Sequence, residues 1–324
     1  MRFQSFIVVS SVFLTLLVGP SPLFAQLSIP ILRGEIAKTA GGCLVWQPFV
    51  APPGGAPNTP DVSWDGACVA GYAEGPGHAT ARFADGSLQL DAVFHQGMPQ
   101  GDSRLTENGR PFFEGRFTEK GPDGIGNIVL ETKTKVTAEF RLGTVASILS
   151  IKLPDGTGFD GQLDATAQNG RGIIIQSNGD RYDGGINNYK YEGFGAIVYA
   201  SGIRYEGEWH QGMKHGRGKL FALNGNHVEG KWRENELEGH AITYSSDGKV
   251  LIDAIWYAGK RTGFGVTVLQ DKGRFEGNWL NGLPEGQGKL IRTDGTVVEG
   301  LWHQGCLKHS NQTVAILVDP SSCR

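Results

Sequence analysis

A pattern of about 23 residues recurs along most of this 324-residue chain and limits its possible folds more than any other feature. The spacing is 26 residues for the first unit and 24 for the unit from Val228. A partial unit begins at Val298, and ten full units begin at Trp64, Leu90, Phe113, Val136, Phe159, Tyr182, Tyr205, Val228, Ile252 and Phe275. Such a period is typical of a repeat protein, in which each unit packs against its neighbours.

Each unit has the pattern of a β-hairpin. In the clearest one, Tyr205, Gly207 and Trp209 alternate with acidic residues, which indicates a strand with one apolar face. A turn glycine follows, then two glycines separated by one residue and a second apolar strand. In the two clearest units the residues expected to build the repeat are Tyr205, Glu206, Gly207, Trp209, Gly212, Gly216, Gly218, Phe275, Glu276, Gly277, Trp279, Gly286 and Gly288.

Glycine is the compositional outlier, with 49 residues and no collagen triplet. Units end in dipeptides such as Asp155-Gly156 and Asn178-Gly179, which suit tight hairpin turns. Each connection between hairpins is therefore another hairpin turn. We predict an all-β fold over residues 64–297: an elongated, curved single-layer antiparallel sheet of tandem hairpins.

The two ends of the chain differ from the repeats. Residues 1–25 have Arg2, an apolar run and a small residue at Ala25, which predicts a cleaved signal peptide and export to the periplasm or the medium. The run is shorter than the roughly 20 apolar residues of a membrane span. Residues 26–63 are rich in proline and glycine and are expected to be an irregular N-terminal segment and cap. Residues 298–324 are expected to form a partial repeat and a second cap.

All four cysteines lie after the predicted cleavage point, and an even count in an oxidising compartment suggests two disulfides. The pairing Cys43 with Cys68 and Cys306 with Cys323 is the simplest of three possible connectivities. A zinc site does not fit, because no two cysteines are separated by two residues.

Three segments carry a resemblance to a known family. YEGEWHQGMKHGRG from Tyr205, FEGNWLNGLPEGQG from Phe275 and YDGGINNYKYEGFG from Tyr182 resemble the MORN repeat. The unit from Val136 is the poorest match because it lacks both paired glycines. The resemblance implies a sheet of hairpins that holds protein partners or lies at membranes, with no catalytic activity or cofactor of its own. With a signal peptide, the chain looks like exported bacterial members.

Repetition argues against a catalytic site. The second position of the units carries an acidic residue in ten of eleven cases, whereas a catalytic carboxylate pair is normally unique. Three His-Gln-Gly triplets, which begin at His95, His210 and His303, occupy the same turn position and lie too far apart in sequence to share a metal ion. We therefore expect no catalytic residue and no metal, and we assign the triplets to turn structure.

One basic stretch is the candidate binding site: Lys214, His215, Arg217, Lys219, Lys231 and Arg233. Aligned on adjacent hairpins, these side chains would form a strip that could meet anionic lipid or an acidic partner. Interleaved glutamates would weaken its field, so a solvated, self-neutralising face is the preferred interpretation. The net charge of −3 gives no footprint for nucleic acid.

The sequence thus favours a non-enzymatic exported scaffold that binds an unidentified protein of the cell envelope. Peripheral binding to anionic membranes through the basic strip is one alternative. An envelope glycan binder or hydrolase is another, because a row of aromatic residues could stack sugars. A regular row of that kind is more often a core, and its members are Tyr205, Trp209, Trp232, Trp256, Phe275, Trp279 and Trp302.

Overall fold

A computed structural model describes residues 33–49, 60–84, 86–270, 272–309 and 312–323. The predicted signal peptide lies outside these residues. The chain divides into two compact units. Unit 1 holds the described residues up to 177 together with 186–189, and unit 2 holds residues 178–185 and the described residues from 190 onward. Within the described residues, no helix has the length and apolar character needed to cross a bilayer.

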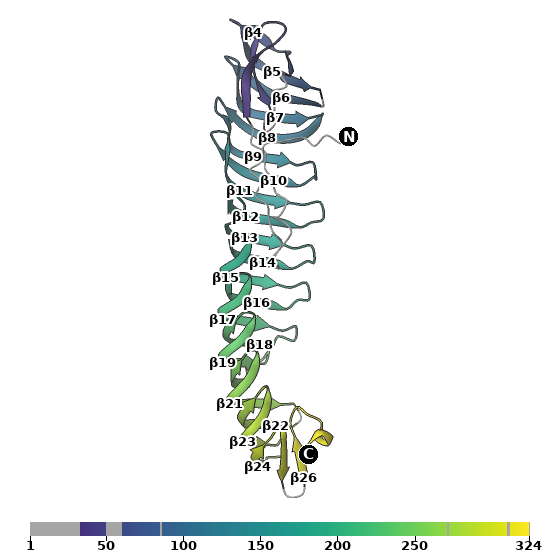
Figure 1. The fold of residues 1–324 in the computed structure, drawn as a ribbon, viewed down its shortest axis with the longest axis vertical. Helices are drawn as coiled ribbons and strands as arrows, with labels where there is room; N and C mark the ends of the chain where they lie inside the picture. The colour runs from purple at the N-terminus through teal and green to yellow at the C-terminus, as the bar shows by residue number, and fades with distance from the viewer. Residues whose placement is uncertain (1–32, 50–59, 85, 271, 310–311, 324) are drawn as a thin grey trace. The chain divides into compact units, whose positions relative to one another are not determined.

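Unit 1 consists of strands that mostly pair with their neighbours in sequence, in antiparallel fashion, as Figure 1 shows. Its strands are β1 (Arg33–Lys38), β2 (Leu44–Phe49), β3 (Asp61–Trp64), β4 (Ala67–Val69), β5 (Tyr72–Phe83), β6 (Gly86–His95), β7 (Met98–Glu107), β8 (Arg110–Thr118), β9 (Gly121–Val129), β10 (Lys135–Arg141), β11 (Thr144–Lys152), β12 (Gly158–Asp164) and β13 (Gly170–Ile175). One bridge, Leu44 with Tyr72, is parallel, so this part of the sheet is mixed.

The N-terminal segment is more regular than its composition predicts. β1 and β2 form an antiparallel hairpin in which Ala37 pairs with Val45, and the ring of Trp46 lies against Gly34. Trp46 is buried and meets Phe117 edge to face at 5.5 Å. The expectation of an irregular segment is therefore wrong for residues 33–49, because buried apolar side chains on this hairpin outweigh the local glycines.

Unit 2 repeats the same meander. Its strands are β14 (Arg181–Asn187, the last two residues of which belong to unit 1), β15 (Lys190–Val198), β16 (Arg204–His210), β17 (Met213–Phe221), β18 (His227–Arg233), β19 (Glu236–Tyr244), β20 (Val250–Tyr257), β21 (Lys260–Leu269), β22 (Gly273–Leu280), β23 (Leu283–Ile291) and β24 (Val297–Trp302). A separate hairpin of β25 (Cys306–His309) and β26 (Gln312–Ala315) and a short 3-10 helix, η1 (Pro320–Ser322), follow. The all-β hairpin fold predicted from the sequence is confirmed.

The core of unit 2 is a row of aromatic rings laid over glycines. Tyr205 is fully buried, and its hydroxyl donates to the carbonyl oxygen of Glu208 at 3.1 Å on its own strand. This ring lies across Gly207 and Gly218, which pair across β16 and β17, and a Cβ on either glycine would collide with it. The paired glycines therefore exist because the aromatic ring needs the space above the backbone.

Tryptophans link consecutive hairpins. The indole Nε1 of Trp209 donates to the carbonyl oxygen of Gly195 at 3.1 Å, fourteen residues earlier. The same bond recurs at 3.1–3.3 Å for Trp232, Trp279 and Trp302. Trp256 is the exception, because its buried Nε1 has no partner among the described residues. The strands beside it carry Ala241 and Ala254 where other repeats have glycine, so the pattern is weakest at β19 and β20.

Two disulfides lie at the ends of the described chain. Cys43 is bonded to Cys68 and Cys306 to Cys323, which is the local pairing expected from the sequence. The second bond ties β25 to the end of η1, and Ile316 is fully buried beneath this cap. Disulfides of this kind are typical of proteins that reside in an oxidising environment.

Candidate binding surface

The sheet of unit 2 has two unlike faces. One carries the buried aromatic rings described above. The other, called the open face here, carries the side chains that alternate with them, such as Glu206 and Lys219, which pair across β16 and β17. The core rings fill one side of the single sheet, so a ligand that binds without unfolding the repeats must use the open face or the turns.

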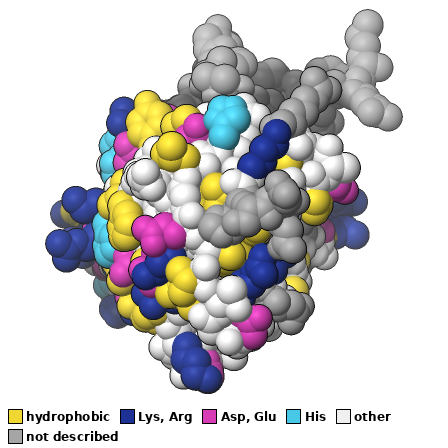
Figure 2. Space-filling model, turned by 90° about the horizontal axis from the view of Figure 1, so that it is seen from below, with side chains coloured by type: hydrophobic (Ala, Val, Ile, Leu, Met, Phe, Trp, Pro, Cys, Tyr) yellow, Lys and Arg dark blue, Asp and Glu magenta, His cyan; other side chains and the backbone are white. Residues whose placement is uncertain are grey.

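Four of the repeated carboxylates on the open face have partners. Glu206 pairs with Arg204, Glu276 pairs with Arg274 at 3.0 Å, and Asp253 pairs with His240 at 2.6 Å. Glu229 pairs with Lys219 at 2.7 Å, and this bond holds the pKa of the Glu229 carboxyl below its usual range. Figure 2, a view of the molecule from below, shows basic and acidic side chains lying beside each other among hydrophobic ones. At these four positions the repeated acidic residue therefore stabilises the sheet locally.

The His-Gln-Gly triplets form one recurring turn. In unit 2, Glu192 accepts from the backbone N–H of Gln211 at 2.9 Å and lies 3.0 Å from Nδ1 of His210. Gln211 has a positive φ of 50°, as the turn requires. The same arrangement joins Glu74 to His95 and Gln96, and Glu285 to His303 and Gln304. We call it the turn clamp, and it ties each of these turns to the preceding hairpin.

The structure does not bring the six basic residues of the predicted strip together. Lys214 lies on the core face, with its Nζ 4.8 Å from the ring centre of Trp232, and burial lowers the pKa of its ammonium group. Lys219 is on the open face but is paired with Glu229. Arg217 and Lys231 are exposed cross-strand neighbours on that face. The remaining two, His215 and Arg233, lie nearer the hairpin turns of β16–β17 and β18–β19.

A second set of open-face positions varies from repeat to repeat. In each repeat of unit 2 one exposed residue follows the first of the paired glycines. Its cross-strand partner on the next strand is the residue directly before the tryptophan of that strand. We call these the variable pairs. They are Phe194 with Glu208, Arg217 with Lys231, His240 with Ile255, Phe264 with Asn278, and Gln287 with Leu301. Their members share one face and one register but no common chemistry.

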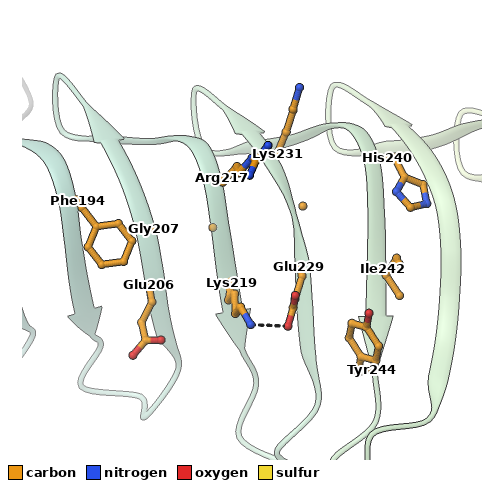
Figure 3. Close-up of a pocket in the computed structure, with 12 residues that line it drawn as sticks. Phe194, Glu206, Gly207, Arg217, Lys219, Glu229, Lys231, His240, Ile242 and Tyr244 are labelled. Atoms are coloured by element: carbon orange, nitrogen blue, oxygen red, sulfur yellow. Dashed lines mark hydrogen bonds and ion pairs between the residues drawn. The ribbon is translucent and has the colours of Figure 1, made fainter.

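Four members of the variable pairs line one side of a hollow of about 460 Å³. Figure 3 shows Phe194, Arg217, Lys231 and His240 along one side, with Lys219 and Glu229 joined on the other. Its lining also includes the glycines of β16, β17 and β18, namely Gly207, Gly218 and Gly230. These glycines contribute backbone atoms to the hollow, because a Cβ on Gly207 or Gly218 would point to the Tyr205 ring on the core face. The hollow lies entirely within unit 2.

A stack of side chains borders this hollow. Arg204 lies over the ring of Phe221 at 4.3 Å, Phe221 stacks on His227 at 5.3 Å, and His227 stacks on Tyr244 at 5.0 Å between ring centres. Each step crosses one strand boundary, from β16 to β19. The stack stiffens the edge of the hollow, since each flat group is held by its neighbour.

The described residues contain no group of three or more histidine, cysteine or acidic side chains with the spacing of a metal site. The basic stretch predicted from the sequence contains only Arg217 and Lys231 of the variable pairs. The signal that could have found the variable pairs is the residue after the first paired glycine, which is Phe194, Arg217, His240, Phe264 and Gln287 in successive repeats.

A family model for the MORN repeat matches five consecutive segments: 182–204, 205–226, 229–250, 253–274 and 275–297. Residues 182–297 are MORN repeats. The five matched MORN repeats nearly coincide with the units predicted from Tyr182 to Phe275, whereas the units from Trp64 to Phe159 lie outside the match.

Two further comparisons add little to the MORN assignment. None of the curated proteins compared matches the chain. Among solved structures, the crystal structure of BamB from Moraxella catarrhalis is 11% identical and is matched over 73% of this chain and 89% of its own, with a TM-score of 0.16. A TM-score this low supports no inference about fold or function.

Proposed function

We propose that the repeats of residues 182–302 are a non-enzymatic scaffold that binds a protein partner through the open face. The observation that carries this proposal is the set of variable pairs. Their large apolar members Phe194, Phe264 and Leu301 are 63%, 61% and 68% exposed. Exposed apolar residues arranged in register are typical of an interaction surface.

The proposal places this scaffold outside the cytoplasm, in the cell envelope. Its support is the predicted signal peptide over residues 1–25 together with the two disulfides. N-terminal sequencing of the mature protein tests this part, and a chain that still begins at Met1 would contradict it.

Site-specific photo-crosslinking in the cells that make the protein tests the binding surface. A photoreactive amino acid replaces Phe194 or Phe264, and the control replaces Leu223, which is 70% exposed but lies in the turn between β17 and β18. We expect both open-face positions to link to the same protein. Added unlabelled scaffold should compete for that protein and reduce the linking. Equal linking from Leu223, or links to lipid or glycan alone, would contradict the proposal.

A further inference from the structure

The pair Arg217 and Lys231 stands out among the variable pairs because both members are cations. They are direct cross-strand neighbours on β17 and β18, which places their Cβ atoms about 4.5–5.5 Å apart. Like charges in this position destabilise a sheet. Neither side chain forms an ion pair with a carboxylate of the described residues.

The nearby acidic groups are already engaged. Glu229 is bonded to Lys219, Glu206 to Arg204, and Glu208 accepts from the backbone N–H of Arg217 at 2.9 Å. The hollow therefore contains three cationic and two anionic side chains, and the charge left over lies at Arg217 and Lys231. A forked guanidinium and a mobile ammonium that are cross-strand neighbours, neither of them paired with a carboxylate of the described residues, suit a carboxylate ligand.

Taken together with the scaffold function, on which this inference rests, we propose that Arg217 and Lys231 bind an acidic side chain of an extended segment of the partner protein. A flat anionic membrane fits less well, since Glu206, Glu208 and Glu229 share the open face and would repel a continuous layer of negative charge. A single carboxylate seated in the hollow meets the two free cations and avoids most of that repulsion.

The spacing of the repeats suggests the form of the segment. Each repeat contributes two strands, so successive variable pairs lie about 9.5 Å apart. A polyproline II segment advances about 9.3 Å per turn of three residues and points every third side chain the same way. A segment lying across the strands would thus meet one variable pair with every third residue. It would place an apolar residue at Phe194, an acidic residue at Arg217 and Lys231 three positions later, and an apolar residue at Phe264 six positions after that.

Peptide binding tests this directly. The probe is a fluorescent, proline-rich ten-residue peptide with leucine at positions one, seven and ten and glutamate at position four, and matched peptides carry glutamine at position four or glutamate at position five. We expect fluorescence anisotropy to show saturable binding of the first peptide to the full mature protein. Each matched peptide should bind about tenfold more weakly or worse.

The variant Arg217→Gln with Lys231→Gln should lose about tenfold or more in affinity for the glutamate peptide. The control Lys260→Gln with Lys289→Gln removes the same charge elsewhere in unit 2 and should bind as the parent does. Circular dichroism establishes that both variants fold. Equal binding of glutamate and glutamine peptides, or unchanged binding by the Arg217 and Lys231 variant, would overturn the inference.

Two outcomes separate this inference from the scaffold function. If the Arg217 and Lys231 variant still crosslinks the partner from Phe194 as the parent does, the scaffold function stands and the acidic-segment inference fails. If anionic vesicles of phosphatidylglycerol bind the parent but not this variant, and the glutamate peptide does not compete, the site takes lipid and the inference is likewise overturned.

Discussion

Tyr205 and Gly218 show how single residues determine the repeat. The ring needs a flat backbone beneath it, and the glycine supplies that surface. Arg217 lies beside this contact but faces the other way, so its side chain is free to vary. At the residue scale, core and surface are therefore decided by alternation along one strand.

Replacement of Gly218 by alanine should destabilise the protein. The new Cβ would collide with the Tyr205 ring, and overpacking of this kind costs about 1–3 kcal/mol. Gly41→Ala is the matched control, because its Cβ would meet only Thr39 at an ordinary 3.9 Å. Urea denaturation measures both, and equal midpoints for the two variants would show that the ring does not need the glycine.

Lys231→Gln should instead stabilise the protein at low ionic strength. It relieves the repulsion with Arg217, worth roughly 0.2–1 kcal/mol for a directly opposite pair. Salt should diminish the gain because it screens exposed charges. The control Lys219→Gln removes a partner of Glu229 and should give no gain. A melting temperature that falls for Lys231→Gln at low salt would contradict the repulsion.

At the scale of elements, the turn clamps join hairpins that are about one repeat apart. The backbone N–H of Gln211 donates to the Glu192 carboxylate and is the main cause of a pKa below the ordinary 4.5. The contact with His210 lowers the pKa of this carboxyl further. A lowered pKa in the folded state means that the clamp stabilises the protein above pH 4.5 and that this contribution is lost as pH falls through the folded-state value.

Glu192→Gln should therefore lower the melting temperature at pH 7 and leave it less dependent on pH between 5 and 3 than in the parent. The measurement is a series of thermal melts across that range. Glu234→Gln is the control, because Glu234 is exposed in a different turn and belongs to none of the three turn clamps described above. This variant should show the same fall in melting temperature between pH 5 and 3 as the parent. If the melting temperatures of the parent and of Glu192→Gln fall equally steeply between pH 5 and 3, the clamp does not contribute as proposed.

Trp256 on β20 should contribute less to stability than the other tryptophans of unit 2, because its indole N–H has no hydrogen-bond partner among the described residues. Trp256→Phe removes an indole N–H that has no partner, whereas Trp279→Phe also breaks the bond to Gly265 at 3.3 Å. We expect Trp279→Phe to cost about 1 kcal/mol more in urea denaturation. A larger loss in the free energy of unfolding for Trp256→Phe than for Trp279→Phe would contradict this prediction.

At the scale of the whole molecule, the sequence predicted the repeats, their boundaries near Tyr205 and Phe275, and the local cysteine pairing. These features depend on neighbours in the chain, which a period reveals. The prediction from the sequence was wrong for the hairpin at residues 33–49, where the ring of Trp46 packs against Phe117, which is distant in sequence. It also grouped Lys214 with Arg217, although the bulge near Gly207 and the alternation of β17 send them to opposite faces.

The C-terminal disulfide should matter for the stability of unit 2. Cys306 and Cys323 close a loop with a sequence separation of 17, worth about 3 kcal/mol in the chain-entropy model. Cys306→Ser with Cys323→Ser should lower the denaturation midpoint by a corresponding amount, and a reducing agent should then have no further effect at this end. Free thiols at these positions in the mature parent protein, found by mass spectrometry, would contradict the bond.

The variable pairs have a consequence for how binding specificity can change over time. Residues such as Phe264 and Asn278 are exposed neighbours on the open face, so a new pair can arise there by two substitutions with little penalty in folding. Each repeat can then acquire a new preference independently of the next. A lineage of such proteins can retain one architecture while its partners diverge.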